Sequence, residues 1–238
     1  CYCIEDACHA LGAKYSKDKK DTIGNCKYSD ITTFSFHPLK SITTGEGGMV
    51  STNKKNFYIH MLKKRNHGFE LKKNKKNNYN WKHVLNNTGF NFRLNDFQCA
   101  LGISQLNKLE KFIKERNNIA KIYLKKLNAL NDYIDLPKNN KFYSAWHLFI
   151  INFKLDKLKI SREKIIQQLY KSKILTQVHY IPNYRHKPFL IKKFGKFPGA
   201  EKYFSSCLSI PIYPNLKSRD LSYIIKNLRK ILKKYKKN

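Results

Sequence analysis

Stretches typical of β-strands alternate with stretches typical of helices along the first half of the chain. Residues 29–37 (SDITTFSFH) and 47–53 (GGMVSTN) have the β-branched and aromatic composition of strands. Residues 55–68 follow with the apolar spacing of a helix, which Gly68 would end. This exchange of strand and helix predicts an α/β fold. The 238 residues, 41% of them hydrophobic, suffice for one large or two small domains with a sizeable core.

The strongest helical signal starts after Asn95 and Asp96, either of which can cap a helix. Apolar residues then recur at helical spacing as far as Leu127, which predicts one long amphipathic helix, straight or bent. Residues 69–90, just before it, are rich in Lys and Asn and predict a surface loop. Residues 131–141 (NDYIDLPKNNK) interrupt the helical pattern and indicate a domain junction.

Predicted strands and helices also alternate along the rest of the chain. Strands are expected at residues 144–153 and 175–180, and helices at 161–174 and 218–235, with Ser161 and Ser218 as their N-caps. This part therefore predicts a small α/β domain. We expect two domains, at residues 1–130 and 131–238.

The formal net charge of +32 comes mostly from lysine and allows two interpretations. Such a charge can attract nucleic acid or another anionic surface. It can also be a composition bias, because the lysines are scattered along the whole chain and occur with many Asn and Ile residues. The local clusters at 72–80 and 231–238 lack a zinc-finger spacing or an RNA-binding motif. We expect no specific nucleic-acid partner and keep a basic nucleic-acid-binding module as an alternative function.

The first twelve residues, CYCIEDACHALG, combine cysteines, a histidine and two acids. The spacing C-x-C-x4-C-H is not a usual zinc spacing, and no second cysteine pair follows. We therefore expect no metal site and interpret these cysteines as packing residues around a strand at residues 1–6. The next residues, ACHALGAKY, suit a short helix or a turn.

No stretch approaches the about 18 apolar residues of a membrane span, and no signal segment opens the chain. We therefore expect a cytoplasmic protein that does not enter a membrane. The chain begins without Met, and residues 1–4 read as a buried strand already under way. This leads us to expect a C-terminal fragment of a longer protein, with only part of its functional site.

The stretch SFHPLKSITTGEGG (35–48) places Lys40 just after a strand, in a turn shaped by Pro38. A glycine-rich turn follows, and Ser35 stands five residues before the lysine. An amine positioned at a strand end beside a hydroxyl suits an imine with an aldehyde cofactor. The residues alone leave a second interpretation open, in which Lys40 is one more surface lysine.

This stretch, together with two others, resembles the signature of the DegT/DnrJ/StrS family of sugar aminotransferases. The other two are EDACHALG (5–12) and GFNFRLNDFQCALG (89–102), while QVHYIPNY (177–184) and LSIPIYPNL (208–216) resemble the family's small-domain motifs. The match is in order and covers nearly the whole chain. It implies a fold type I, aspartate aminotransferase-like α/β transferase that uses pyridoxal 5′-phosphate (PLP). This chain would supply the C-terminal part of the large domain and the small domain.

The resemblance also implies roles for individual residues. Lys40 would form the imine with PLP and then move a proton at the substrate carbon. Asp6 would face the pyridine nitrogen and keep it protonated, with His9 near the ring. Ser35 would bind the cofactor phosphate, and Asn91 would reach the phosphate of the neighbouring subunit's cofactor. The resemblance thus implies a homodimer with shared active sites.

For the substrate, the resemblance implies L-glutamate as amino donor and a nucleotide-linked 4-keto sugar as acceptor. The motifs are most similar to those of members that aminate UDP-linked 4-keto-6-deoxy-N-acetylated sugars for pseudaminic acid or related surface glycans. His179, Tyr180 and Arg93 would contact the substrate. A different nucleotide sugar, or a catalytically idle member, are the alternatives. Because the family's N-terminal segment supplies further cofactor contacts, we expect these 238 residues alone to bind PLP weakly and to be inactive.

Overall fold

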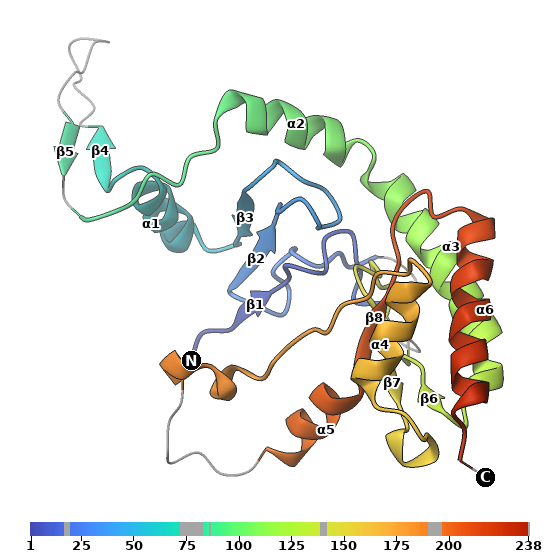
Figure 1. The fold of residues 1–238 in the computed structure, drawn as a ribbon. Coiled ribbons are helices and arrows are strands. Elements are labelled where there is room, and N and C mark those ends of the chain that lie inside the picture. Colours follow the sequence, from blue (N-terminus) through green and yellow to red (C-terminus); the bar gives the residue numbers. More distant parts are fainter. Residues whose placement is uncertain (17–19, 72–82, 86, 139–141, 190–196, 238) are drawn as a thin grey trace. The chain divides into compact units, whose positions relative to one another are not determined.

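The computed structural model describes residues 1–16, 20–71, 83–85, 87–138, 142–189 and 197–237. These residues form two compact units (Figure 1), one of Cys1–Glu110 with Lys141–Ala145 and one of Lys111–Asn140 with Trp146–Asn238. We expected a division at residue 130. The units divide earlier because helix α3 (Leu109–Leu127) buries one face in the core of the second unit. Each unit mixes helices and strands, as expected.

The first unit is built on a three-stranded sheet in the order β1 (Ile4–Asp6), β2 (Ile31–Ser35), β3 (Gly48–Ser51). Strand β1 runs parallel to β2, and β3 runs antiparallel to β2. The strands expected within 29–37 and 47–53 are thereby confirmed. Because parallel strands end at the same edge of a sheet, Asp6 and Ser35 close β1 and β2 on one side.

The expectation of a buried strand at the start of the chain was wrong. Tyr2 is 73% exposed and Ile4 is 66% exposed. The physical reason is that β1 is an edge strand, since among the described residues it pairs only with β2. Cys1 and Cys3 are exposed as well and are not packing residues, whereas Cys26 is buried. The stretch after β1 forms turns rather than a helix.

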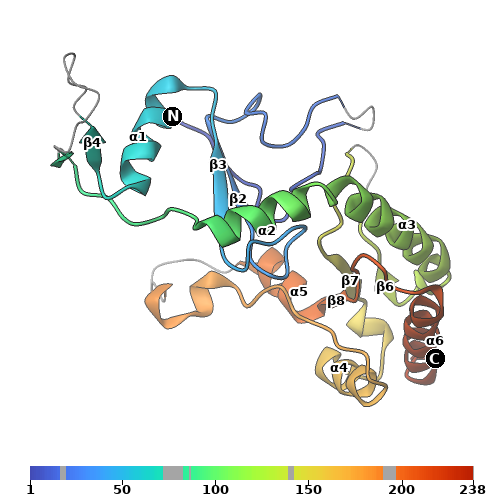
Figure 2. The same cartoon turned by 90° about the horizontal axis from the view of Figure 1, so that it is seen from above.

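The expected long helix is two successive helices, α2 (Asp96–Leu106) and α3, both labelled in Figure 2. Asn95 caps α2 as expected, because its side chain accepts a hydrogen bond from the backbone N–H of Gln98 at 2.9 Å. The side chain of Gln98 accepts in return from the backbone N–H of Asn95 at 3.0 Å, which completes a capping box. Helix α2 buries none of its residues.

Helix α1 (Lys55–Arg65) is confirmed where the sequence placed it. The expected loop over 69–90 contains an antiparallel pair, β4 (Phe69–Leu71) with β5 (His83–Leu85), so that expectation was incomplete. Gly68 precedes β4 with a φ of +85°, and a Cβ there would lie 1.7 Å from the carbonyl oxygen of Asn87. The lysine cluster at 72–80 lies outside the described residues.

The second unit is an antiparallel sheet in the order β6–β7–β8 with helices packed against it. Its elements are β6 (Ile134–Asp135), β7 (Phe149–Phe153), β8 (Cys207–Ile210), α4 (Arg162–Lys171), α5 (Pro198–Ser206) and α6 (Ser218–Lys234), with 3-10 turns at Asn128–Leu130, Leu155–Lys157, Asn183–Arg185 and Lys187–Phe189. None of the helices described here is both long and apolar enough to span a membrane.

Some elements of the second unit agree with the expectations from the sequence and others do not. Ser161 caps α4 as expected, accepting from the backbone N–H of Lys164 at 3.3 Å. Ser218 is the first residue of α6 rather than its cap. The strand expected at 175–180 was wrong, because this segment meets β8 only at a single bridge between Gln177 and Ser209.

A buried cation fixes loops of the second unit. Arg116 on α3 is 5% exposed, and its Nη1 donates to the carbonyl oxygens of Trp146 (3.2 Å), His147 (3.3 Å) and Ile212 (2.9 Å). Burial lowers the pKa of Arg116 to about 10, so the side chain stays charged at neutral pH. One guanidinium thus anchors two loops to the helix.

We predict that Arg116→Met lowers the free energy of unfolding by about 3 kcal/mol, because three carbonyl groups lose their donor and each costs about 1–3 kcal/mol when left unsatisfied. Urea unfolding of the full-length protein measures this. Lys121→Met, at an exposed position of the same helix, is the control and should change stability little. Equal unfolding midpoints for the two variants would contradict the anchoring role.

Candidate functional site

Lys40 lies in the segment 36–47, here called the Lys40 loop, which joins β2 to β3. The loop is closed at its base, because the backbone N–H of Phe36 donates to the carbonyl oxygen of Gly47 at 2.8 Å. The carbonyl oxygen of Phe36 in turn accepts from the backbone N–H of Thr44 at 3.0 Å and from the hydroxyl of Thr43 at 3.1 Å. The loop is therefore held by its own polar groups, in addition to the burial of Phe36 and Ile42 in the apolar cluster of the first unit.

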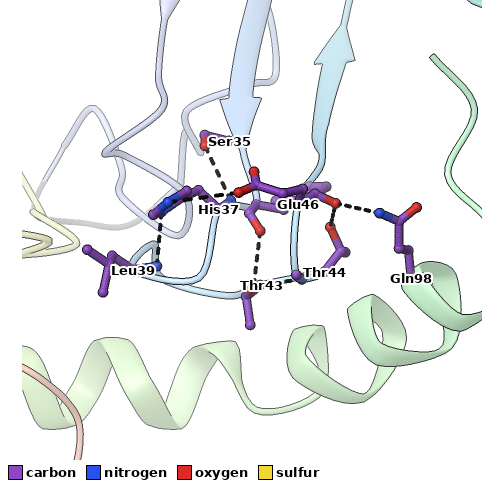
Figure 3. A network of polar contacts seen from close by, with 9 residues as sticks. Ser35, His37, Leu39, Thr43, Thr44, Glu46 and Gln98 are labelled. Carbon is purple, nitrogen blue, oxygen red and sulfur yellow. Dashed lines mark hydrogen bonds and ion pairs between the residues drawn. The ribbon is translucent and has the colours of Figure 1, made fainter. Parts of the chain in front are cut away.

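His37 shapes the turn that carries the lysine (Figure 3). Its Nδ1 accepts from the backbone N–H of Leu39 at 3.2 Å, and its carbonyl oxygen accepts from the backbone N–H of Lys40 at 2.9 Å. With Nδ1 as acceptor, the ring proton lies on Nε2, which is 4.0 Å from Oε1 of Glu46. The backbone N–H of His37 donates to the hydroxyl of Ser35 at 3.4 Å. Ser35 therefore lies beside the base of this turn.

Asp6 ends β1 with its carboxylate exposed. Its Oδ1 accepts from the backbone N–H of Cys8 at 3.0 Å. Hydrogen bonds from the thiol and from the backbone N–H of Cys8 lower the pKa of Asp6, and the charges of His9 and Lys40 lower it further. His9 and Lys40 thus both lie within electrostatic reach of Asp6. Asp6 is ionised at neutral pH.

The neighbouring acid, Glu5, is used differently. Its Oε2 accepts from the hydroxyls of Tyr15 at 2.6 Å and Thr32 at 3.0 Å. Since successive side chains of a strand point to opposite faces, Glu5 and Asp6 project to opposite sides of β1. The sequence motif contains both acids, and the structure shows that Glu5 is committed to hydrogen bonds within the first unit.

Asn91 and Arg93 contact residues near the C-terminal end of α1. Asn91 forms a bridge with Asn66, just beyond the end of α1. The Nη1 of Arg93 donates to the side-chain oxygen of Asn66 at 2.5 Å. Both residues are exposed, and the hydrogen bonds of this segment run to the C-terminal end of α1.

His179 and Tyr180 belong to the second unit and form a group of their own there. The Nδ1 of His179 lies 2.7 Å from the hydroxyl of Ser209 on β8. The ring of Tyr180 stands edge-on to the ring of His179 at 4.6 Å between centroids. Tyr180 is 61% exposed.

Sequence reasoning missed three residues that build the site, namely Cys8, His37 and Gln98. A signal existed for His37, because it stands two residues before Leu39 in the stretch SFHPLK and its ring nitrogen can accept from a backbone N–H in such a turn. Cys8 and Gln98 occupy unspecified positions of their motifs and gave no signal. Within the described ranges, no group of three or more His, Cys, Asp or Glu residues is placed to hold a metal ion.

Comparison with known proteins gives one consistent result. Residues 1–229 match the DegT/DnrJ/EryC1/StrS aminotransferase family. The chain is 38% identical over 237 residues to an uncharacterized protein of Methanocaldococcus jannaschii, covering 97% of this chain and 60% of that protein. It is 35% identical over 237 residues to the UDP-4-amino-4,6-dideoxy-N-acetyl-beta-L-altrosamine transaminase of Campylobacter jejuni, covering 98% of this chain and 59% of that protein. The chain thus spans about 60% of the length of these curated relatives.

A solved structure extends this result to the fold. Helicobacter pylori PseC, described as an aminotransferase involved in the biosynthesis of pseudoaminic acid, aligns with a TM-score of 0.86 at 30% identity. The alignment covers 97% of this chain and 59% of PseC. The likeness confirms the expected fold type I class with its mixture of helices and strands.

We predict that Cys8→Ala raises the pKa of Asp6 toward its ordinary value of 3.8, because the thiol hydrogen bond is the largest cause of the lowering. The backbone N–H of residue 8 remains, so the pKa should stay below that value. A carboxyl with a lowered pKa stabilises the fold above its ordinary pKa and loses this contribution as the pH falls through the folded pKa. In Cys8→Ala that loss should therefore occur at higher pH.

Carbon-13 NMR titration of the Asp6 carboxyl measures this pKa directly. Cys3→Ala, at an exposed cysteine of the preceding segment, is the matched control and should leave the titration of Asp6 unchanged. The same titration curve in Cys8→Ala and the parent protein would show that the thiol does not act on Asp6.

Proposed function

Because the chain belongs to the DegT/DnrJ/EryC1/StrS aminotransferase family, we propose that it carries the reactive lysine of a PLP-dependent sugar aminotransferase. In this proposal the amino group passes from L-glutamate to the 4-keto position of a UDP-linked 4-keto-6-deoxy-N-acetylated sugar. The observation that carries the proposal is that the ionised carboxylate Asp6 and the loop that carries Lys40 follow two parallel strands at the same edge of the sheet, where the charge of Lys40 helps to lower the pKa of Asp6. The names of the Campylobacter and Helicobacter relatives support the sugar class.

The donor set at this edge fits PLP. A lysine amine can hold the cofactor's aldehyde carbon, and an ionised carboxylate suits the protonated ring nitrogen. Asp6 meets the second requirement because hydrogen bonds from Cys8 favour its ionised form. The hydroxyl of Ser35 can donate to the phosphate. When bound, PLP supplies an electron-withdrawing ring that stabilises negative charge on the substrate carbon.

In this proposal each of the protein's own side chains has a separate role. The turn built by His37 would aim Lys40, whose Nζ would take up and give back the proton at the reacting carbon of the substrate. Asp6 would keep the ring nitrogen of the cofactor protonated, and His9 would lie near the ring. In the second unit, His179 and Tyr180 would bind the nucleotide sugar, and Arg93 would pair with an anionic group of a substrate.

We also propose a homodimer with shared active sites, and the first unit offers a surface for it. Helix α2 buries none of its residues and exposes Phe97 (89%), Ile103 (64%) and Leu106 (54%). Phe90 and Phe92, which stack on each other at 5.0 Å, are also exposed. Apolar surface of this kind marks protein interfaces. Asn91 stands between the two phenylalanines, so a second copy on this surface would bring it toward the partner's cofactor phosphate.

We place this activity in the cytoplasm. All six cysteines are free, which suits a reducing compartment. The alternative within the same proposal is a different nucleotide sugar, since members of the family that act on different sugars share most of these motifs. The nucleotide base and the substituents of the sugar ring are therefore the variables to test.

We predict that the full-length, PLP-loaded protein aminates C4 of a UDP-linked 4-keto-6-deoxy-N-acetylated sugar in the presence of L-glutamate. Product NMR with a panel of UDP-, dTDP- and GDP-linked 4-keto sugars identifies the acceptor. Lys40→Ala should lower turnover about 1,000-fold or more because the reacting amine is lost. Lys111→Ala, at an exposed lysine of α3, is the control. Unchanged turnover in Lys40→Ala would overturn the assignment of the lysine, and amination of a dTDP or GDP sugar alone would correct the substrate.

We predict that inactive Lys40→Ala and Asn91→Asp protomers complement each other when mixed. In a mixed dimer with shared sites one site regains both native residues, so random exchange should restore about one quarter of parent activity. Lys40→Ala mixed with Asp6→Asn is the matched control, because both residues come from one protomer and no complete site forms. Equal activities of the two mixtures would argue against shared sites.

A further inference from the structure

The side chain of Gln98 forms a hydrogen bond that joins helix α2 to the Lys40 loop. The carbonyl oxygen of Glu46 accepts two hydrogen bonds, from the hydroxyl of Thr44 at 2.7 Å and from Nε2 of Gln98 at 3.0 Å (Figure 3). The other end of the Gln98 amide, Oε1, accepts from the backbone N–H of Asn95 at 3.0 Å. The amide therefore joins the N-terminus of α2 to the loop.

The Lys40 loop and the segment of α2 lie so close together that a side chain would not fit at two glycine positions. A Cβ on Gly102 of α2 would lie 2.9 Å from the methyl carbon of Thr44. A Cβ on Gly47 would lie 2.9 Å from a methyl carbon of Leu94 and 2.3 Å from the hydroxyl of Thr44. Thr44 itself is 3% exposed. Loop and helix are thus packed together with the glycines that such an approach requires.

We propose that Gln98 is a positioning residue for Lys40. It fixes the carbonyl of Glu46, and the next residue, Gly47, accepts the hydrogen bond from Phe36 that closes the base of the loop. Loss of the Gln98 contact would free the segment of Glu46 and Gly47, and with it the turn that carries Lys40. The inference rests on the proposed function for its catalytic consequence, whereas its structural part stands on the contacts alone.

The residue type matters because only an amide can do both tasks. Gln98 donates to the loop through Nε2 and accepts from the helix cap through Oε1. A glutamate in its place keeps the acceptor, suits the N3 position of a capping box and adds a favourable negative charge at the helix N-terminus. It cannot donate to the Glu46 carbonyl when ionised. Gln98→Glu therefore removes the loop contact and leaves the helix cap.

The test compares Gln98→Glu, Gln98→Met and Asn95→Ala with the parent full-length protein. Hydrogen exchange of the Phe36 and Thr44 amides reports on the loop with and without PLP, and the pH midpoint of the bound-PLP absorbance reports on Lys40. In Gln98→Glu we expect about tenfold faster exchange, a shifted absorbance midpoint and about tenfold lower kcat, with KM for L-glutamate and Tm close to parent. Gln98→Met should show the same loop changes with a lower Tm.

Asn95→Ala separates the cap from the loop. It removes the acceptor for the Gln98 backbone N–H and should lower Tm, while loop exchange stays nearer to parent because Nε2 still reaches Glu46.

Parent-like exchange and absorbance in both Gln98 variants would overturn the proposal. So would an effect in Gln98→Glu that Gln98→Met does not share, since that would trace to the added charge. If the parent protein aminates no sugar while the exchange differences persist, the proposed function fails and the loop contact of Gln98 is supported.

Discussion

The site depends on the parallel pairing of two short strands. In this register Asp6 lies opposite Thr33, and the backbone N–H of Ala7 continues the ladder to the carbonyl oxygen of Thr33 at 2.9 Å. Parallel strands end at one edge, so the turn after Asp6 and the Lys40 loop leave the sheet side by side. A shift of β1 by one residue would turn Asp6 to the other face of the sheet and put Glu5 on the face that Asp6 now occupies. The pairing therefore selects which of two adjacent acids lies at the proposed site.

Polar contacts and a small apolar cluster together hold the site residues. The apolar cluster of the first unit is small, with Phe34, Phe36 and Ile42 among its buried members. The Lys40 loop contributes Phe36 and Ile42 to this cluster and is closed by hydrogen bonds between its backbone, its threonines and His37. Such contacts are directional, so they fix the aim of a side chain where apolar packing would fix only its burial. The second unit has the opposite balance, with a large core that runs from α3 to α6.

Several elements that depend on local interactions were predicted correctly from the sequence, whereas several elements that depend on long-range contacts were not. Strands at β2 and β3 and the caps at Asn95 and Ser161 follow from local patterns, and the structure has them. The buried strand at the start, the single long helix and the strand at 175–180 were wrong. Each of these depended on what a segment meets in space, such as a second strand beside it or a core that accepts one face of a helix. Composition cannot supply that information.

The sequence by itself determined the α/β class, the family signature and the placement of Lys40 just after a strand, because these follow from residue type and spacing. Tertiary structure alone decided that Asp6 rather than Glu5 is available, that Cys8 favours its ionised form, and that Gln98 joins α2 to the Lys40 loop. The physical reason is distance along the chain. Gln98 and Glu46 are 52 residues apart, and only the folded backbone brings an amide of one within 3.0 Å of a carbonyl of the other.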